Sequence, residues 1–294
     1  MGPLLFLIYI NDLVEEIDCD IKLFADDTIL YISSNDDQMS ADVLNKNLKK
    51  ITKWSNQWLV NFNPQKTKML NVTNKKDTNQ SKQPIFFSEI EIPTVNEHKH
   101  LGIWIDSKLK WSYQIDQVIG SASKMVDVLH KLKYRLDRST LYTIYVSYIR
   151  PKLEYGCILW DDCTQNDKNR LENIQHRCVR IITGAKKGTS HDAIYNELPI
   201  PSLAERRKQY KLKYMYSVIN DQNPPYIFEC IPANVETSYN LRGHSKVPNF
   251  KTRTAKFENS LLPNCIKIWN ELPINVRTIS QSSEFKSCIL TNQY

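Results

Sequence analysis

The chain has 294 residues, with 39 lysines and arginines against 32 aspartates and glutamates and a formal net charge of +7. This length suggests about two domains and excludes a small scaffold held together by disulfides. The seven cysteines are odd in number and irregularly spaced, so they predict neither a disulfide framework nor a zinc site, and a reducing intracellular setting is expected.

Charge is distributed unevenly along the chain. Residues 1–45 contain ten acids and only one lysine, so the rest of the chain carries a net charge of +16. A basic body of this kind favours a polyanion as partner, although an ordinary surface of mixed charge gives the same totals.

The first apolar stretch, "PLLFLIYI", predicts a helix and not a membrane segment. It is too short to span a bilayer, and no basic region precedes it, so neither a signal peptide nor an anchor is expected. Pro3 suits a first helical position, and apolar residues at 6, 7, 10, 13, 14 and 17 have the spacing of a buried helix face.

The stretch "IKLFADDTILYI" predicts a β-hairpin with strands over 21–25 and 28–32. Asp26 and Asp27 would then lie exposed at the turn. Two neighbouring carboxylates repel each other, and divalent cations would offset that repulsion. Aspartate is also common in plain turns, so the pair alone is a weak signal.

A second amphipathic helix is predicted from Ser40, as N-cap, to Phe62. Short strands are expected over 67–72, 85–92 and 100–106, with the polar segment 73–84 between the first two.

Beyond Asp106 the apolar period changes from two to 3.6, which predicts helices. Their apolar stripes cover 115–132, 141–149 (closed by Pro151) and 171–182 (ended by Gly184). A capping box from Ser202 to Glu205 opens a basic helix that continues through Ile219, and a further helix is expected over 257–269. The predicted fold class is α+β.

Four blocks in order, "GPLLFLIYINDL", "KLFADDT", "WLVNFNPQKTKML" and "HKHLGIWID", resemble the later blocks of the reverse transcriptases of non-LTR (LINE-type, jockey-like) retrotransposons. The resemblance continues through "YIRPKLEYGCILW", "LENIQHRCVRIITG" and "IKIWNELP". It implies a carboxyl-terminal fragment with a truncated polymerase palm over 1–105, a helical thumb over 106–160 and a basic α-rich region over 161–294.

The resemblance also implies roles for individual residues. Asp26 and Asp27 would bind metal, two Mg²⁺ ions in the intact family, and Lys66 would protonate the leaving pyrophosphate. Contacts to template, nucleotide or primer end would come from Gly2, Pro3, Leu101 and Gly102. Structural explanations without a catalytic or binding role stay open. Lys66 would also suit a solvated turn, and Gly102 would also suit a tight crossing of strands.

Clustered basic residues suggest further contacts, independently of the resemblance. Lys and Arg are dense over 124–152 and 170–213, with few acids, so electrostatic binding of nucleic acid is expected there. Arg206, Arg207 and Lys208 are the candidates at the start of the basic helix.

One departure from the family pattern bears on activity. The family's first metal-binding aspartate lies upstream of the "GPLL" block, and in this sequence only Met1 precedes Gly2. The expectation is therefore an RNA-directed DNA polymerase by family that is inactive as this chain and binds Mg²⁺ weakly or not at all. Its partners would be an RNA template and a DNA primer, without a membrane, in the nucleus or cytoplasm. The alternative is a non-catalytic basic remnant that binds RNA or DNA.

Overall fold

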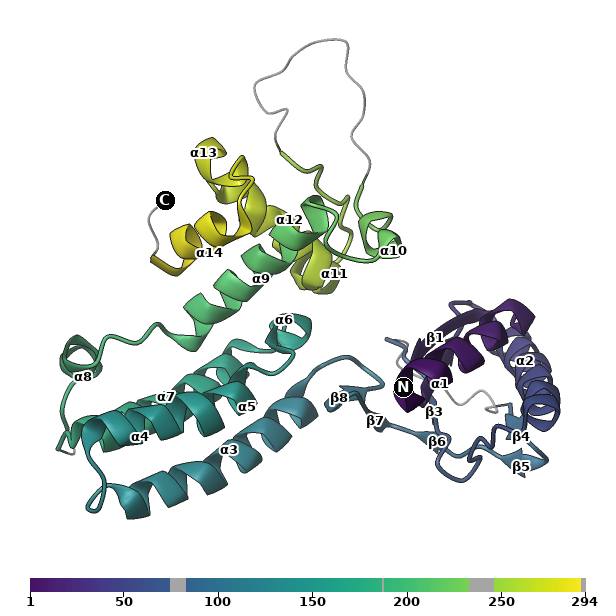
Figure 1. Cartoon of the computed structure of the whole chain (residues 1–294), viewed down its shortest axis with the longest axis horizontal. Coiled ribbons are helices and arrows are strands. Elements are labelled where there is room, and N and C mark those ends of the chain that lie inside the picture. The colour runs from purple at the N-terminus through teal and green to yellow at the C-terminus, as the bar shows by residue number, and fades with distance from the viewer. Residues whose placement is uncertain (75–82, 187, 233–245, 292–294) are drawn as a thin grey trace, which may run out of the picture. The chain divides into compact units, whose positions relative to one another are not determined.

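The computed structural model describes residues 1–74, 83–186, 188–232 and 246–291. Most of the polar segment 73–84 therefore lies outside the described residues. Internal contacts divide the chain into two units, Met1–Leu109 and Lys110–Tyr294 (Figure 1). The first unit mixes helices with small sheets and the second is helical, which confirms the α+β class. The divisions expected after residues 105 and 160 stay predictions.

The first unit begins with α1 (Gly2–Asn11), which Pro3 enters at its first turn, followed by the 3₁₀ helix η1 (Asp12–Glu16). Ile10 and Leu13 are buried as the apolar spacing predicts, but Leu7 and Val14 are exposed. The switch from an α-helix to a 3₁₀ helix at Asp12 changes the period, which accounts for the exposure of Val14.

Helix α2 (Asp37–Trp58) starts earlier and ends earlier than predicted. Its N-cap is Asp36, not Ser40, because the Asp36 carboxylate accepts hydrogen bonds from the backbone N–H groups of Gln38 and Met39. Leu59, in the left-handed conformation with φ 57°, ends the helix before Phe62.

The strands of the first unit pair two by two. They are β1 (Asp20–Phe24), β2 (Asp27–Tyr31), β3 (Met69–Leu70), β4 (Phe86–Phe87), β5 (Ile90–Glu91), β6 (Thr94–Val95), β7 (Glu97–His100) and β8 (Ile103–Asp106). Strands β1–β2, β4–β5 and β7–β8 pair antiparallel, and β3–β6 pair parallel.

Two segments predicted as single strands are hairpins. Segment 85–92 turns at Ser88 and Glu89. Segment 100–106 turns at Leu101 and Gly102, and its hairpin begins at Glu97, before the predicted strand. All four turn residues have positive φ, as a type I′ turn requires at both central positions. Ser, Glu and Leu are unusual at such positions, so the sequence prediction was wrong about these turns.

The second unit is built of helices in chain order. They are α3 (Ser112–Leu132), α4 (Arg138–Ile144), the π-helix η2 (Tyr145–Ile149), α5 (Arg150–Glu154), α6 (Cys157–Trp160), α7 (Gln165–Thr183), α8 (His191–Glu197), α9 (Leu203–Ile219), α10 (Pro225–Phe228), α11 (Ala255–Asn259), α12 (Leu261–Glu271), α13 (Ile274–Arg277) and α14 (Ser282–Thr291). Gly184 ends α7 with φ 71°, and Ser202 caps α9 by accepting from the Glu205 N–H, as predicted.

Two helix predictions were wrong. Pro151 does not close its helix, because the Arg150 N–H bonds to the Tyr145 carbonyl and the resulting π-turn carries the chain past the proline. The helix expected over 257–269 is broken at Ser260, whose extended backbone separates α11 from α12.

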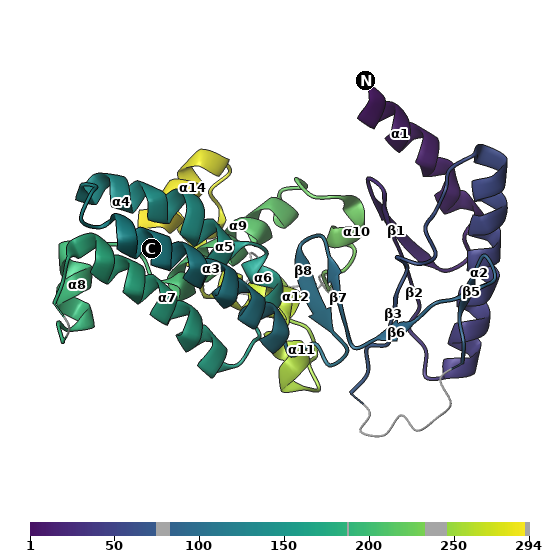
Figure 2. The same cartoon turned by 90° about the horizontal axis from the view of Figure 1, so that it is seen from below.

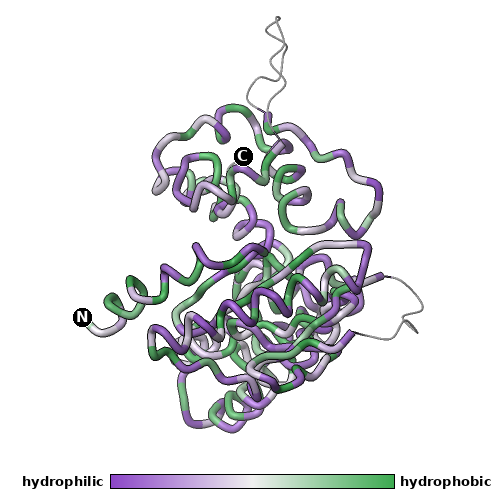
Figure 3. Tube along the Cα trace, turned by 90° about the vertical axis from the view of Figure 1, so that its right-hand side faces the viewer, coloured by the Kyte–Doolittle hydropathy of each residue, from purple (hydrophilic) through white to green (hydrophobic). Residues whose placement is uncertain are grey.

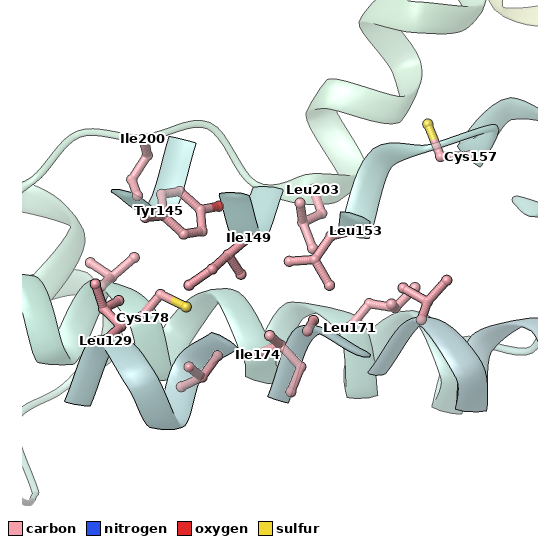
Figure 4. Packing of buried hydrophobic residues seen from close by; sticks show 14 of the residues in the cluster. Leu129, Tyr145, Ile149, Leu153, Cys157, Leu171, Ile174, Cys178, Ile200 and Leu203 are labelled. Atoms are coloured by element: carbon pink, nitrogen blue, oxygen red, sulfur yellow. The ribbon is translucent and has the colours of Figure 1, made fainter. Parts of the chain in front are cut away.

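Two hydrophobic clusters form the core of the second unit. The first extends from α3 to the start of α9, and Figure 4 shows Leu129, Ile149 and Leu171 among its members. Inside it the Tyr145 hydroxyl donates to Gln175 Oε1 at 2.6 Å. The second cluster joins the end of α9 to α12, α13 and α14. Helix α9 therefore contributes to both clusters.

Candidate functional site

Asp26 and Asp27 lie at the tip of the β1–β2 hairpin. The register pairs Phe24 with Asp27, so the loop is only Ala25 and Asp26, and Asp27 is the first residue of β2 instead of a turn residue as predicted. Both aspartates are exposed, as expected. Ala25 has φ 51°, a conformation that costs a non-glycine residue on the order of 1 kcal/mol and that the two-residue turn imposes.

One face of the hairpin holds it on the first unit. Ile21, Leu23 and Leu30 pack against the hydrophobic cluster that includes Leu13 and Leu48, and Figure 2 shows the strands beside α1 and α2. Because side chains alternate along a strand, Asp27 lies on the opposite face together with Phe24. Packing on one face therefore presents the Asp27 carboxylate to solvent on the other.

An apolar surface accompanies this tip, as predicted. Leu4, Leu5 and Ile8 of α1 and Phe24 of β1 are each at least 60 % exposed. The α1 segment at the N-terminus is coloured mostly as hydrophobic in Figure 3. Within the described residues, β1 and β2 pair only with each other, so their outer edges carry unpaired backbone groups.

The hairpin tip offers the type of ligand that a hard divalent cation binds, but only two side chains provide it. Two carboxylates supply the oxygen ligands that Mg²⁺ prefers. Across the described parts of the chain, no group of three or more histidine, cysteine, aspartate or glutamate side chains comes together as a metal site. Asp26 and Asp27 therefore fit a part of a metal site.

Lys66 lies in a separate turn. Asn63 Oδ1 accepts from the backbone N–H groups of Gln65 and Lys66, which fixes the turn, and the Lys66 side chain is exposed. Among the described residues no ion pair joins Lys66 to Asp26 or Asp27, so the structure does not bring these three predicted residues into contact.

The remaining predicted contact residues of the first unit are exposed. Gly2 and Pro3 form the first turn of α1. Leu101 and Gly102 are the two turn residues between β7 and β8, with φ 46° and 83°. The positive φ of Gly102 by itself favours glycine at this position, independently of any contact with nucleic acid.

His98 is a neighbour of the acidic tip that sequence reasoning took for an ordinary surface residue. Burial lowers the pKa of His98, the neighbouring His100 adds to that effect, and the Asp27 carboxylate opposes it. Asp27 is therefore close enough to interact electrostatically with a half-buried imidazole on β7. The only sequence signal was the His-Lys-His run, whose alternation places His98 and His100 on one strand face.

The three basic residues of α9 that were predicted to contact nucleic acid, Arg206, Arg207 and Lys208, do not form an exposed basic surface. Arg206 forms an ion pair with Glu154, and Arg207 is 2 % exposed with its Nε 2.7 Å from Asp161 Oδ1. Lys208 is half-buried. The amphipathic pattern predicted the helix but could not show that its arginines face acids of α5 and of the turn after α6.

Residues 1–105 match the family model described as "Reverse transcriptase (RNA-dependent DNA polymerase)". This part of the chain is therefore similar to the reverse transcriptase family.

The longer similarity is to polymerases of mobile elements. The chain is 23 % identical over 246 residues to a probable RNA-directed DNA polymerase from transposon X-element of Drosophila melanogaster, covering 76 % of this chain and 26 % of that protein. It is 24 % identical over 226 residues to the RNA-directed DNA polymerase from mobile element jockey of the same species, covering 73 % and 24 %. The resemblance to non-LTR retrotransposon polymerases is thus confirmed, and the chain spans about a quarter of the length of these relatives.

None of the helices in the described residues combines the length and the apolar character that crossing a membrane requires.

Proposed function

We propose that the chain is part of an RNA-directed DNA polymerase of a non-LTR retrotransposon, in which Asp26 and Asp27 are metal ligands. The observation that supports this most is the exposed aspartate pair at the tip of a two-residue hairpin, inside the segment that matches the reverse transcriptase family. Residues 1–105 would form the palm, 106–160 the thumb and 161–294 a basic region. Lys66, Gly2, Pro3, Leu101 and Gly102 keep their proposed contacts with nucleotide, template and primer.

Mg²⁺, when bound, would supply charge stabilisation for nucleotidyl transfer from a nucleoside triphosphate to a primer. The Asp26 and Asp27 carboxylates would hold it, and the packing of the opposite hairpin face would fix their position. Two carboxylates without a third ligand bind such an ion weakly, because preorganised charge is what makes these sites effective. The chain alone should therefore not extend a primer, and an intracellular location, in the nucleus or cytoplasm, follows from the proposed substrate.

Metal binding tests the site directly. Mn²⁺ binding to the purified chain, followed by electron paramagnetic resonance, should be weak and should be lost when Asp26 and Asp27 are both replaced by asparagine. The matched control replaces Asp36 and Asp37, another exposed adjacent pair, by asparagine, which also keeps the N-cap of α2. Equal loss in both double variants would refute a specific role for the hairpin tip.

Primer extension tests the expected inactivity. With an RNA template, a DNA primer and Mg²⁺ or Mn²⁺, the chain should incorporate no nucleotide. Template-dependent incorporation that Asp26→Asn abolishes would show a complete catalytic site in this chain and would contradict the partial-site proposal.

A second candidate function is non-catalytic binding of RNA or DNA by the basic second unit. Residues 110–294 carry 27 lysines and arginines against 17 aspartates and glutamates, a net charge of +10 that favours it. The two candidates differ in their dependence on Asp26 and Asp27, which matters for metal binding but not for electrostatic retention of nucleic acid.

A further inference from the structure

The turn that joins α3 to α4 combines an exposed aromatic ring with cations. Tyr134 lies in this turn with 84 % of its surface exposed, so its ring contributes little to the core. An isolated exposed apolar side chain would need no explanation, but the neighbours of this one are unusual. Lys131, Lys133 and Arg135 occupy positions within three residues of it.

These three cations are not neutralised by ion pairs within the described chain. Of the two nearby acids, Asp127 pairs with Arg177, and Asp137 accepts hydrogen bonds from Ser139 and the Thr140 N–H as the N-cap of α4. Those hydrogen bonds lower the pKa of Asp137, which commits the carboxylate to its capping role.

One cation also contacts the ring. Lys133 Nζ lies 4.6 Å from the centre of the Tyr134 ring, a cation–π contact. That contact covers one face of the ring and places an ammonium group next to it. Since the side chain is so exposed, the other face is open to solvent.

The end of the neighbouring helix α7 extends the positive surface. Arg170 pairs with Asp116 and Arg177 with Asp127, so α3 and α7 run parallel and both end at this side of the second unit. Arg180 and Lys186 belong to the end of α7 and the loop after it. The turn around Tyr134 itself offers three cations and one flat aromatic face.

From this arrangement we infer that Tyr134, with Lys131, Lys133 and Arg135, forms a binding site for single-stranded nucleic acid. The inference rests on the proposed function for the nature of the partner. An unpaired base stacks on the open face of Tyr134, and the three cations contact the flanking phosphates. A base inside a duplex is already stacked on both sides, so duplex nucleic acid gains only the phosphate contacts.

Fluorescence anisotropy with labelled oligo(U) RNA, alone and annealed to oligo(A), tests this mode with the full chain. Tyr134→Ala should weaken binding of the single strand by roughly 5- to 100-fold, the effect of removing one stacked base, and leave duplex binding unchanged. Tyr134→Phe, which keeps the ring, should bind as the unmodified chain does. Tyr226→Ala is the matched control, because Tyr226 is also exposed but has Asp221 and Glu229 nearby.

The salt dependence tests the cations separately. Replacing Lys131, Lys133 and Arg135 by glutamine should reduce the slope of log affinity against log salt by about 2, since a single strand contributes roughly 0.7 per phosphate contact. Lys131 and Arg135 are exposed and Lys133 is half-buried, and circular dichroism checks that the helices persist.

Three results would overturn the inference: no binding of oligo(U) at low salt, equal binding by Tyr134→Ala and the unmodified chain, or a Tyr134→Ala defect only toward vesicles of phosphatidylcholine and phosphatidylserine. The last result would assign the surface to anionic membranes. Failure of the proposed function is distinguishable, since Mn²⁺ binding at Asp26 and Asp27 would then be absent whatever oligo(U) binding shows.

Discussion

Replacing Asp161 by asparagine should destabilise the second unit strongly. The two oxygens of this carboxylate accept from Arg207 Nε at 2.7 Å and Lys211 Nζ at 2.5 Å. Arg207 and Lys211 are 2 % and 3 % exposed, so an asparagine would leave two buried cations without their counter-charge. Removing one partner of a buried ion pair costs about 3–5 kcal/mol, which corresponds to a fall in Tm of roughly 6–20 °C for a domain of this size.

Urea and thermal unfolding at neutral pH, followed by circular dichroism, measure this loss. The matched control is Asp116→Asn, because Asp116 pairs with Arg170 at an exposed position and should cost less than about 1 kcal/mol. Adding Lys211→Met to Asp161→Asn should recover part of the stability, since it removes one of the uncompensated charges. A loss for Asp161→Asn no larger than that for Asp116→Asn would refute the reasoning.

The same pair predicts a pH dependence. Burial alone would raise the pKa of Asp161, but Lys211 and Arg207 outweigh it and lower the pKa below its usual value. A carboxyl group whose pKa is lowered by folding stabilises the protein above its unfolded pKa of about 3.9, and that contribution is lost as the pH falls through the folded value. The difference in stability between the unmodified chain and Asp161→Asn should therefore shrink on acidification below about pH 4.

Two further pairs of substitutions test the helix ends by urea unfolding. Gly184→Ala should lower the stability by about 1 kcal/mol, because φ is 71° at this residue. Gly120→Ala, inside α3 and with open space around it, should raise the stability by about 0.5–1 kcal/mol. Equal effects would show that the left-handed conformation is not what requires glycine at position 184. Asp36→Ala should cost about 1 kcal/mol as loss of an N-cap, and Ser40→Ala should cost clearly less; the reverse order would restore Ser40 as the cap.

The helices of the second unit were largely predictable because their signals are local. The apolar stripe of α3, the glycine after α7 and the serine before α9 each act within a few residues. The hairpin turns at Ser88–Glu89 and Leu101–Gly102 were not predictable in the same way, since three of these residues adopt a positive φ that their side chains disfavour.

For the candidate site, sequence placed Asp26 and Asp27 at an exposed hairpin tip but missed the contacts between distant segments. The interaction of Asp27 with His98 and the pairing of Arg207 with Asp161 join residues more than forty positions apart. Composition correctly indicated a basic second unit. It could not distinguish arginines that neutralise buried acids from exposed lysines such as Lys131.

Helix α9 has a consequence for how the second unit unfolds. Leu203 near its start belongs to one hydrophobic cluster, and Leu212 and Met215 near its end belong to the other. Neither cluster can lose α9 without exposing apolar surface of its own, so melting of one half removes support from the other. The two clusters should consequently behave as one cooperative unit, and the amide protons in the middle of α9 should be among the slowest in the second unit to exchange with solvent.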